Sequence, residues 1–480
     1  MLLNYSKIWE SPTLMTWLSY LTRALSLLVV LPMILMKFTE AEISVWYLFS
    51  SVIALSSLLD FGFRTTFVRI ISFAMGGAKQ VGIFDGNTII NGRSNWYLIE
   101  KIFSVMKSIY FWLSIVVFIF MLTFGTWSMK RPVSLLIIEK QAWIAWGVII
   151  FSTVIKFYGT IYQNYLEGLN KVALVRKTES IISTGLIFLS IIVLYCDGGI
   201  LQLIIVFQGF SLLNFLANFF IARRIEDKRL IRFSKIPFNK DFFLQIWRPA
   251  WRSGISGLMS IGLTNLSGVL YAQIGSVHLV AGYLLALRII NQVKEVSLAP
   301  FYSKIPLMSR LRVEGNKKEL ISIAKKGMLI SHSVFILSVI FVSIFSSYIL
   351  ELINSNVSFV TKDFWILLSF AFFVHRYGAM HMQLYLTTND VKSHIADGIS
   401  GLVFILVSYL LIRDFDIYAF PIGMIAGYLG FYAIYSAKLS LKNLALNFFN
   451  FELKALIFPL LIFALYVLYF LITKKTNYEI

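Results

Sequence analysis

Ionisable side chains inside apolar runs are the residues of this 480-residue chain that can carry chemistry. Soluble-enzyme motifs are absent, since the sequence has no G-x-x-x-x-G-K-S/T, no H-E-x-x-H and no G-x-S-x-G. The cations inside apolar runs are Arg23, Arg64, Arg69, Lys107, Lys156, Arg288, Lys294 and Arg376. The anions there are fewer: Asp60, Glu167 and Glu295. Because an excess of buried positive charge needs a negative partner, this set predicts a site for a phosphate-bearing molecule.

Several of these charges have a simpler interpretation. Asp60 and Arg64 are four residues apart on one helical face, where they can pair with each other. Arg69, Lys107 and Glu167 lie near the ends of their apolar runs and can extend to the membrane interface. The pattern leaves both interpretations open for these five residues.

Three arginines are harder to explain in this way. Arg23, Arg288 and Arg376 each lie well inside an apolar run. Lys294 is adjacent to Glu295, so the two side chains point in different directions and do not neutralise each other. The predicted cationic cavity therefore consists of Arg23, Arg64, Arg288, Lys294 and Arg376.

Metal and cofactor chemistry is not predicted. His375 and His381 are six residues apart, which does not place two ligands on one helical face. The single cysteine, Cys196, excludes an internal disulfide and a cysteine-based metal site. The two histidines can still respond to protons near neutral pH, and with Asp60 and Glu295 they are the candidates for ion coupling.

The composition places the whole chain in a membrane. Hydrophobic residues make up 58% of it and charged residues only 14%, with a mean hydropathy of +0.78. The net charge of +19 would suggest nucleic-acid binding in a soluble protein. Here the cations lie mostly in short loops between apolar runs, which is typical of contact with anionic headgroups. Membrane lipids are therefore expected partners, and nucleic acid is not.

The apolar runs predict an all-α bundle of 12–14 transmembrane helices, because each run is long enough for a helical span. The first run, Leu14 to Met36, is expected to remain as a helix, since it lacks a cleavage site. Thirteen segments are counted, centred near residues 25, 56, 113, 154, 188, 211, 262, 290, 337, 374, 403, 427 and 463.

Loop charges predict the orientation. With the N-terminus inside, the inner segments hold 27 of the 43 lysines and arginines, and the outer segments hold 8. The N-terminus is therefore expected in the cytoplasm. An odd number of spans would put Lys474 and Lys475 outside, so we expect twelve core helices and one peripheral C-terminal helix.

A basic polar stretch from Arg223 to Arg252 divides the chain near its middle. Short matches between spans 2 and 8, and between spans 4 and 10, favour two parallel six-helix halves. The predicted domains are residues 1–225 and 251–440, joined by a basic cytoplasmic linker at 226–250 and followed by a peripheral helix at 441–480. The glycines of G-I-S-G-L-M-S-I-G, from Gly254, are expected to allow close helix packing.

Two stretches resemble a known family. L-L-D-F-G-F-R-T-T-F-V-R-I-I-S-F-A-M-G-G-A-K, Leu58 to Lys79, and L-E-G-L-N-K, Leu166 to Lys171, resemble polysaccharide transporters. These are the O-antigen and capsule repeat-unit flippases of the multidrug/oligosaccharidyl-lipid/polysaccharide exporter superfamily. The resemblance implies a V-shaped pair of bundles around a central cationic cavity.

The same resemblance implies a function. It predicts that undecaprenyl-pyrophosphate-linked oligosaccharides are moved from the cytoplasmic to the periplasmic leaflet of the bacterial inner membrane. Alternating access, coupling to an ion gradient and contact with other polysaccharide-assembly proteins are implied as well.

Two other functions fit the membrane class. A multidrug exporter of the same superfamily would favour acidic groups in its cavity, whereas basic groups dominate here. A polysaccharide polymerase, ligase or glycosyltransferase would present a large outer loop, but the longest one expected is only about Gly125 to Gln141. A transporter is therefore predicted, and an enzyme is not.

Overall fold

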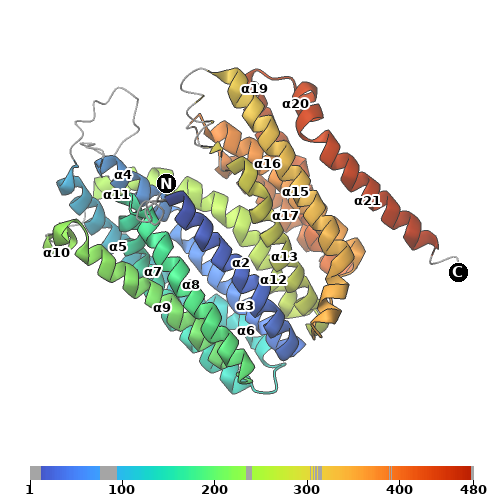
Figure 1. Cartoon of the computed structure of the whole chain (residues 1–480), viewed down its shortest axis with the longest axis horizontal. Coiled ribbons are helices and arrows are strands. Elements are labelled where there is room, and N and C mark those ends of the chain that lie inside the picture. The colour runs from blue at the N-terminus through green and yellow to red at the C-terminus, as the bar shows by residue number, and fades with distance from the viewer. Residues whose placement is uncertain are drawn as a thin grey trace, which may run out of the picture. The chain divides into compact units, whose positions relative to one another are not determined.

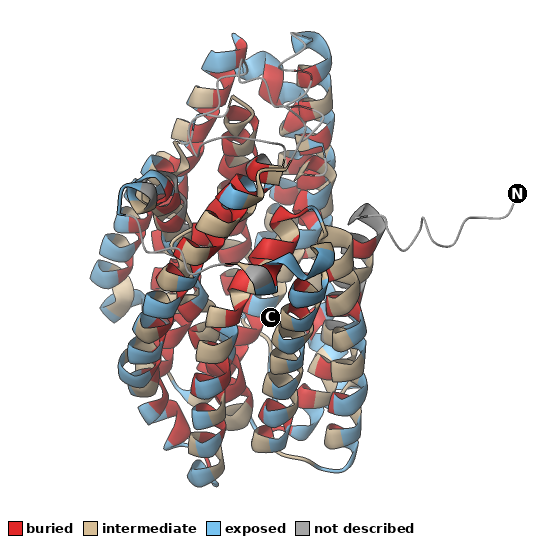
Figure 2. Ribbon diagram, turned by 90° about the vertical axis from the view of Figure 1, so that its left-hand side faces the viewer, coloured by how far each residue is buried: buried red, intermediate tan, exposed pale blue. Residues whose placement is uncertain are grey.

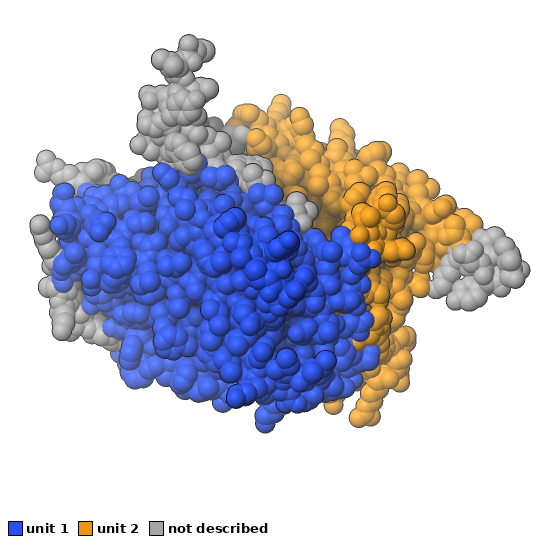
Figure 3. Space-filling model, turned by 60° about the horizontal axis from the view of Figure 1, so that its bottom comes forward, with its two compact units in different colours: residues 1–257, 272–277, 353–356 blue, residues 258–271, 278–352, 357–480 orange. Residues whose placement is uncertain are grey.

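The computed structural model describes residues 12–75, 94–233, 240–302, 316–388 and 392–476, with the single residues 304, 305, 308, 311 and 390 between them. These residues form helices and no strand, which confirms the all-α class over the part of the chain described. Contacts divide the chain into two compact units, shown in blue and orange in Figure 3. Unit 1 comprises Met1–Gly257, Ala272–Val277 and Ile353–Asn356, and unit 2 comprises the remaining residues. The domain boundaries expected from the sequence remain predictions.

The helices of unit 1 carry the labels of Figure 1. They are α2 (Pro12–Lys37), α3 (Glu40–Ser57), α4 (Phe63–Met75), α5 (Trp96–Phe120), α6 (Thr126–Val133), α7 (Glu139–Gly168), α8 (Val172–Tyr195), α9 (Ile200–Arg224), α10 (Arg229–Arg232) and α11 (Lys240–Gly257). Within this unit α7 packs along α9, and α8 packs along α2 and α9.

The chain then continues through a π-helical stretch at Leu258–Gly262. The later helices are α12 (Leu263–Ile274), α13 (Val277–Tyr302), α15 (Lys317–Leu352), α16 (Lys362–Leu386), α17 (Ser393–Phe415), α18 (Ala419–Gly427), α19 (Ala433–Leu444), α20 (Phe448–Ala455) and α21 (Ile457–Thr476). In unit 2, α16 packs against α15 and α19, while α17 packs against α18.

Seven helical stretches in the described residues are long and apolar enough to cross a membrane. They are Glu40–Asp60, Trp96–Val133, Glu139–Gly168, Val172–Tyr195, Ile200–Arg224, Lys317–Leu352 and Ser393–Leu444. The pair α20 and α21, bent by 60°, makes an eighth if it is taken as one span. The protein therefore crosses the membrane several times, and the count of thirteen remains a prediction.

Large apolar side chains on the outward surfaces support a lipid environment. Figure 2 shows exposed residues along many of the helices. The exposed large apolar residues include Phe151, Phe188, Tyr409 and Leu465. Each of these four side chains is more than 60% exposed. A soluble monomer rarely carries apolar patches on this scale, so these surfaces fit contact with lipid chains.

A break between α3 and α4 shapes the part of unit 1 that resembles the transporter signature. The 3₁₀ turn Leu58–Asp60 is followed by Phe61 and Gly62, both with positive φ (48° and 74°). Glycine adopts this conformation without the steric cost that a side chain brings. The break lets the chain turn before α4 begins at Phe63.

Helix α11 approaches this break closely. A Cβ atom built on Gly254 would lie 2.7 Å from the Cα atom of Phe61 and 2.8 Å from its carbonyl carbon and oxygen. The predicted packing role of the glycine run is therefore confirmed for Gly254. Gly257, one turn later, has only an ordinary contact, 3.8 Å from the Leu58 side chain.

Gly254→Ala is expected to lower the free energy of unfolding by about 1–3 kcal/mol, because backbone atoms of Phe61 must move to admit the methyl group. Gly257→Ala is the matched control and should be neutral or stabilising, since its Cβ meets no such contact. Thermal unfolding of both variants in one detergent measures the difference. Equal melting temperatures would contradict the close approach of α11 to Phe61.

Candidate functional site

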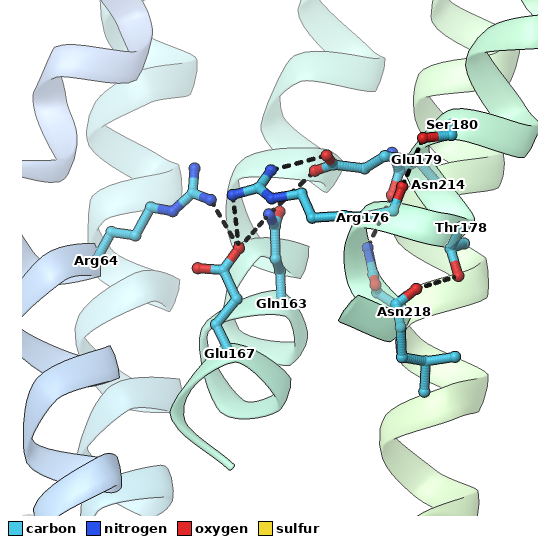
Figure 4. A network of polar contacts seen from close by, with 10 residues as sticks. Arg64, Gln163, Glu167, Arg176, Thr178, Glu179, Ser180, Asn214 and Asn218 are labelled. Carbon is cyan, nitrogen blue, oxygen red and sulfur yellow. Dashed lines mark hydrogen bonds and ion pairs between the residues drawn. The ribbon is translucent and has the colours of Figure 1, made fainter. Parts of the chain in front are cut away.

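Glu167, near the end of α7, lies at the centre of a polar cluster in unit 1 (Figure 4). Its Oε1 atom is 3.2 Å from Nη2 of Arg64 and 3.6 Å from Nη2 of Arg176. Gln163 donates to the same oxygen at 2.9 Å. Arg176 also pairs with Glu179, at 2.8 Å. Two guanidinium groups thus face two carboxylates, and the positive charge of Arg64 is compensated within the protein.

A second polar centre in unit 1 surrounds Asp60. The Tyr110 hydroxyl donates to Oδ1 of Asp60, and the backbone N–H of Arg64 donates to Oδ2 at 2.9 Å. Asn164 in turn donates to the Tyr110 hydroxyl at 3.0 Å. Asp60 therefore contacts Arg64 through the backbone, while the Arg64 guanidinium extends to Glu167 (Figure 4). Asp60 thus accepts a backbone N–H from the first turn of α4.

Arg376 on α16 is the most deeply buried cation among the described residues of unit 2, with 0% exposure. Its Nη2 donates to the Ser331 carbonyl at 2.9 Å, and its guanidinium carbon lies 4.3 Å from the centre of the Phe335 ring. The Nε and Nη1 atoms have no hydrogen-bond partner in the described structure. Neither ring nitrogen of the neighbouring buried His332 has one either.

Two further cations come from α13. Lys294 places its Nζ 5.6 Å from the Phe372 ring and is close enough to Arg376 for the two charges to repel. Arg288 is exposed, as is Glu295. Among the described residues, no carboxylate forms an ion pair with Arg288, Lys294 or Arg376. Glu295 attracts Lys294 without forming an ion pair. Unit 2 therefore holds three cations that no ion pair compensates among the described residues.

The two histidines of α16 occupy separate environments. His375 stacks on Tyr432 and also contacts Tyr428, with ring centres 5.2 Å and 4.6 Å away. Both tyrosines belong to a π-helical stretch, Tyr428–Tyr432, and such stretches often occur at functional sites. His381 is fully buried elsewhere. Within the described part of the chain, no group of three or more His, Cys, Asp or Glu residues is placed to hold a metal.

His381 connects α16 to α19 and α20. Its Nδ1 lies 2.6 Å from the Ser440 hydroxyl, and its Nε2 lies 3.0 Å from Oε1 of Glu452. The Tyr377 hydroxyl donates to that same carboxylate oxygen at 3.1 Å. Glu452 is only 6% exposed, so α20 is held to unit 2 by a buried polar contact.

The remaining predicted residues are dispersed. Arg23 lies in α2, but its side chain is outside the described residues. Arg69, Lys107 and Lys156 are exposed, and the interfacial position of the first two remains a prediction. Glu167 does not extend to the interface, because its side chain is only 10% exposed and is paired.

Sequence reasoning missed several polar residues that the structure places in buried or half-buried contacts. They are Tyr110, Arg176, Glu179, Asp397 and Glu452. Arg176 and Glu179 carried a usable signal, because they are three residues apart and therefore neighbours on one helical face. Asp397 carried a weaker signal, as a carboxylate near the start of an apolar run. The roles of Tyr110 and Glu452 became visible only in the structure, because their partners are distant in the sequence.

Comparison with known proteins identifies the fold. No protein-family model matches the chain, and no curated protein sequence matches it. An inward-facing multidrug resistance MATE family transporter of the MOP superfamily superposes with a TM-score of 0.65 at 15% identity, covering 87% of this chain and 93% of that one. A ligand complex of the MATE multidrug transporter DinF-BH gives 0.63 at 12% identity, covering 92% and 97%.

A third similar structure is a MOP superfamily transporter from Pyrococcus furiosus, for which a reversed polarity of the binding pocket suggests a different function. It has a TM-score of 0.58 at 15% identity and covers 89% of this chain and 93% of that one. These identities are too low to transfer a substrate. The chain has the fold of the MATE transporters of the MOP superfamily.

Proposed function

We propose that this protein moves an anionic lipid-linked oligosaccharide from the cytoplasmic to the periplasmic leaflet of the bacterial inner membrane by alternating access. One observation carries the proposal. Arg288, Lys294 and Arg376 of unit 2 form no ion pair with a carboxylate among the described residues, and only Lys294 has one, Glu295, as an electrostatic neighbour. Arg64 and Arg176 of unit 1 are paired. Charges within membrane helices are costly unless something compensates them. The pyrophosphate of the substrate would supply that compensation.

The MATE fold supports a transport function, and the cations of unit 2 support an anionic substrate. MATE neighbours are known in inward-facing and outward-facing conformations, which are the two states that alternating access requires. The Pyrococcus furiosus neighbour indicates that pocket polarity can differ within this fold. An undecaprenyl-pyrophosphate-linked repeat unit matches the uncompensated cations and the sequence resemblance. Membrane lipids and other polysaccharide-assembly proteins are the proposed partners.

Export of organic cations is the second candidate. It is favoured by the MATE fold of the neighbours and by Asp397, a carboxylate on α17 that is only 5% exposed. A cationic substrate would need such a carboxylate, but it would be repelled by Lys294 and Arg376. Asp397→Asn therefore separates the two candidates, since it should abolish drug export and leave lipid-linked sugar transport measurable.

Deletion of the gene is expected to trap lipid-linked repeat units in the cytoplasmic leaflet, because translocation is the step that would be lost. A membrane-impermeant sugar oxidant applied from the periplasmic side measures this. In the deletion strain most of the accumulated repeat units should be protected, and reintroducing the wild-type gene should expose them.

Single repeat units that accumulate unpolymerised but accessible from the periplasm would contradict the proposal and favour a polymerase. Normal distribution of repeat units, together with increased sensitivity to cationic dyes, would favour the multidrug exporter.

A further inference from the structure

An apolar groove lies in unit 2 between α16, α19, α20 and α21. Its volume is about 670 Å³, which is the size of a pocket for a small molecule. Twelve of its fifteen lining residues are apolar: Phe370, Phe373, Val374, Leu429, Ala433, Ile434, Ala437, Leu441, Leu446, Phe448, Leu456 and Leu460. The other three are Tyr377, Lys438 and Lys442.

The groove has a fixed wall. Glu452 on α20 is buried against His381 of α16, and Tyr377 hydrogen-bonds to the same carboxylate. Lys325 of α15 also donates to the Asn450 carbonyl of α20 at 3.2 Å. Helix α20 thus meets the rest of unit 2 through specific contacts, and α21 packs on α15 and α20; both helices are red in Figure 1. The groove is therefore part of the folded unit.

The two lysines of the lining lie on one face of α19. Lys438 and Lys442 are four residues apart, so they are neighbours on the helix surface. Both are exposed, and neither forms a hydrogen bond or ion pair within the described residues. The loop charges predict that this end of α19 lies on the cytoplasmic side, where the leaflet carries anionic headgroups.

We propose that this groove binds one anionic phospholipid of the cytoplasmic leaflet. An acyl chain lies along the apolar lining, and the phosphate lies between Lys438 and Lys442. The lining offers no Asp, Glu, Asn, Gln, Ser or Thr to hydrogen-bond a sugar. A small phosphodiester headgroup therefore fits this groove, and the oligosaccharide headgroup of the transported substrate does not.

The test is native mass spectrometry of the full-length protein released from nanodiscs that contain either phosphatidylglycerol or phosphatidylcholine. Wild-type protein should retain one phosphatidylglycerol and little phosphatidylcholine. The double variant Lys438→Gln/Lys442→Gln should bind phosphatidylglycerol about 30-fold more weakly, the loss expected for two lysine–headgroup attractions. Lys317→Gln/Lys318→Gln removes the same charge from an exposed pair on α15 outside the groove and should bind as wild type does.

The variant Ala437→Phe distinguishes binding in the groove from attraction to the surface lysines alone, because the larger side chain fills the groove while both lysines remain. It should displace the lipid; unchanged affinity would overturn the groove as the site. Equal affinity of the wild type and the Lys438→Gln/Lys442→Gln variant, or equal retention of the two phospholipids, would overturn the headgroup contact. Displacement of phosphatidylglycerol by an equimolar polyprenyl phosphate would overturn the choice of occupant. None of these measurements depends on a transport assay.

Discussion

Replacing Arg288 with glutamine is expected to slow transport of the lipid-linked substrate by about 10- to 150-fold, the range for loss of one hydrogen bond to a charged group. Arg288 is exposed and makes no hydrogen bond or ion pair among the described residues. Removing its charge should therefore change the stability of the protein little, and the amount of protein in the membrane should be unchanged. The initial rate at which a labelled pyrophosphate-linked sugar becomes accessible across proteoliposomes measures the effect.

Arg413→Gln is the matched control, because Arg413 is also an exposed arginine of unit 2, at the end of α17. Its removal should leave the rate within about twofold of wild type, since an exposed surface charge contributes little. A wild-type rate in Arg288→Gln would exclude Arg288 from substrate binding. An equal loss in both variants would indicate a general effect of net charge.

Arg376 is a less suitable probe than Arg288, although the sequence pattern treats them alike. Its side chain has 0% exposure, donates to the Ser331 carbonyl and stacks on Phe335. Arg376→Ala would leave a cavity and remove these contacts, so a loss of transport could reflect a loss of protein. Arg376→Lys keeps the charge and much of the volume, and it is the variant in which rate and stability can be compared.

The helices were predictable because membrane spans depend on local hydropathy. Each predicted span centre falls inside a helical element, for example residue 25 in α2 and residue 403 in α17. The close packing at Gly254 was also predictable from a run of small residues. Hydropathy and runs of small residues are local signals that a single sequence displays directly, whereas the partner of Gly254, Phe61, is distant in the sequence and was not predicted.

The pairing of charges was not predictable, because it depends on contacts between distant segments. Arg64 and Glu167 are 103 positions apart, so the sequence could not show that one neutralises the other. Asp60 and Tyr110 are 50 positions apart, and Glu452 meets His381 only because α20 folds back on α16. Sequence reasoning identified which charges lie in helices, but contacts decide which of them remain uncompensated.

Glu167→Gln is expected to lower the free energy of unfolding by about 2 kcal/mol, because it leaves the Arg64 guanidinium without its carboxylate. The effect should be smaller than for a fully buried pair, since the Arg64 side chain is 41% exposed. Arg176 keeps its contact with Glu179 and should change little. Chemical denaturation of the purified protein in detergent measures the loss.

A double-mutant cycle with Arg64→Gln tests whether the pair is responsible. If Arg64 and Glu167 act together, the double variant should be more stable than the sum of the single losses implies, by about 0.5–3 kcal/mol. Additive losses would contradict the pairing. Transport adds a second measurement: Arg64→Gln should retain most activity, in contrast to Arg288→Gln, because its charge is compensated by the protein. If Arg64→Gln instead stopped transport at unchanged stability, unit 1 would contribute to the substrate site, and Arg64 would belong with the cations of unit 2.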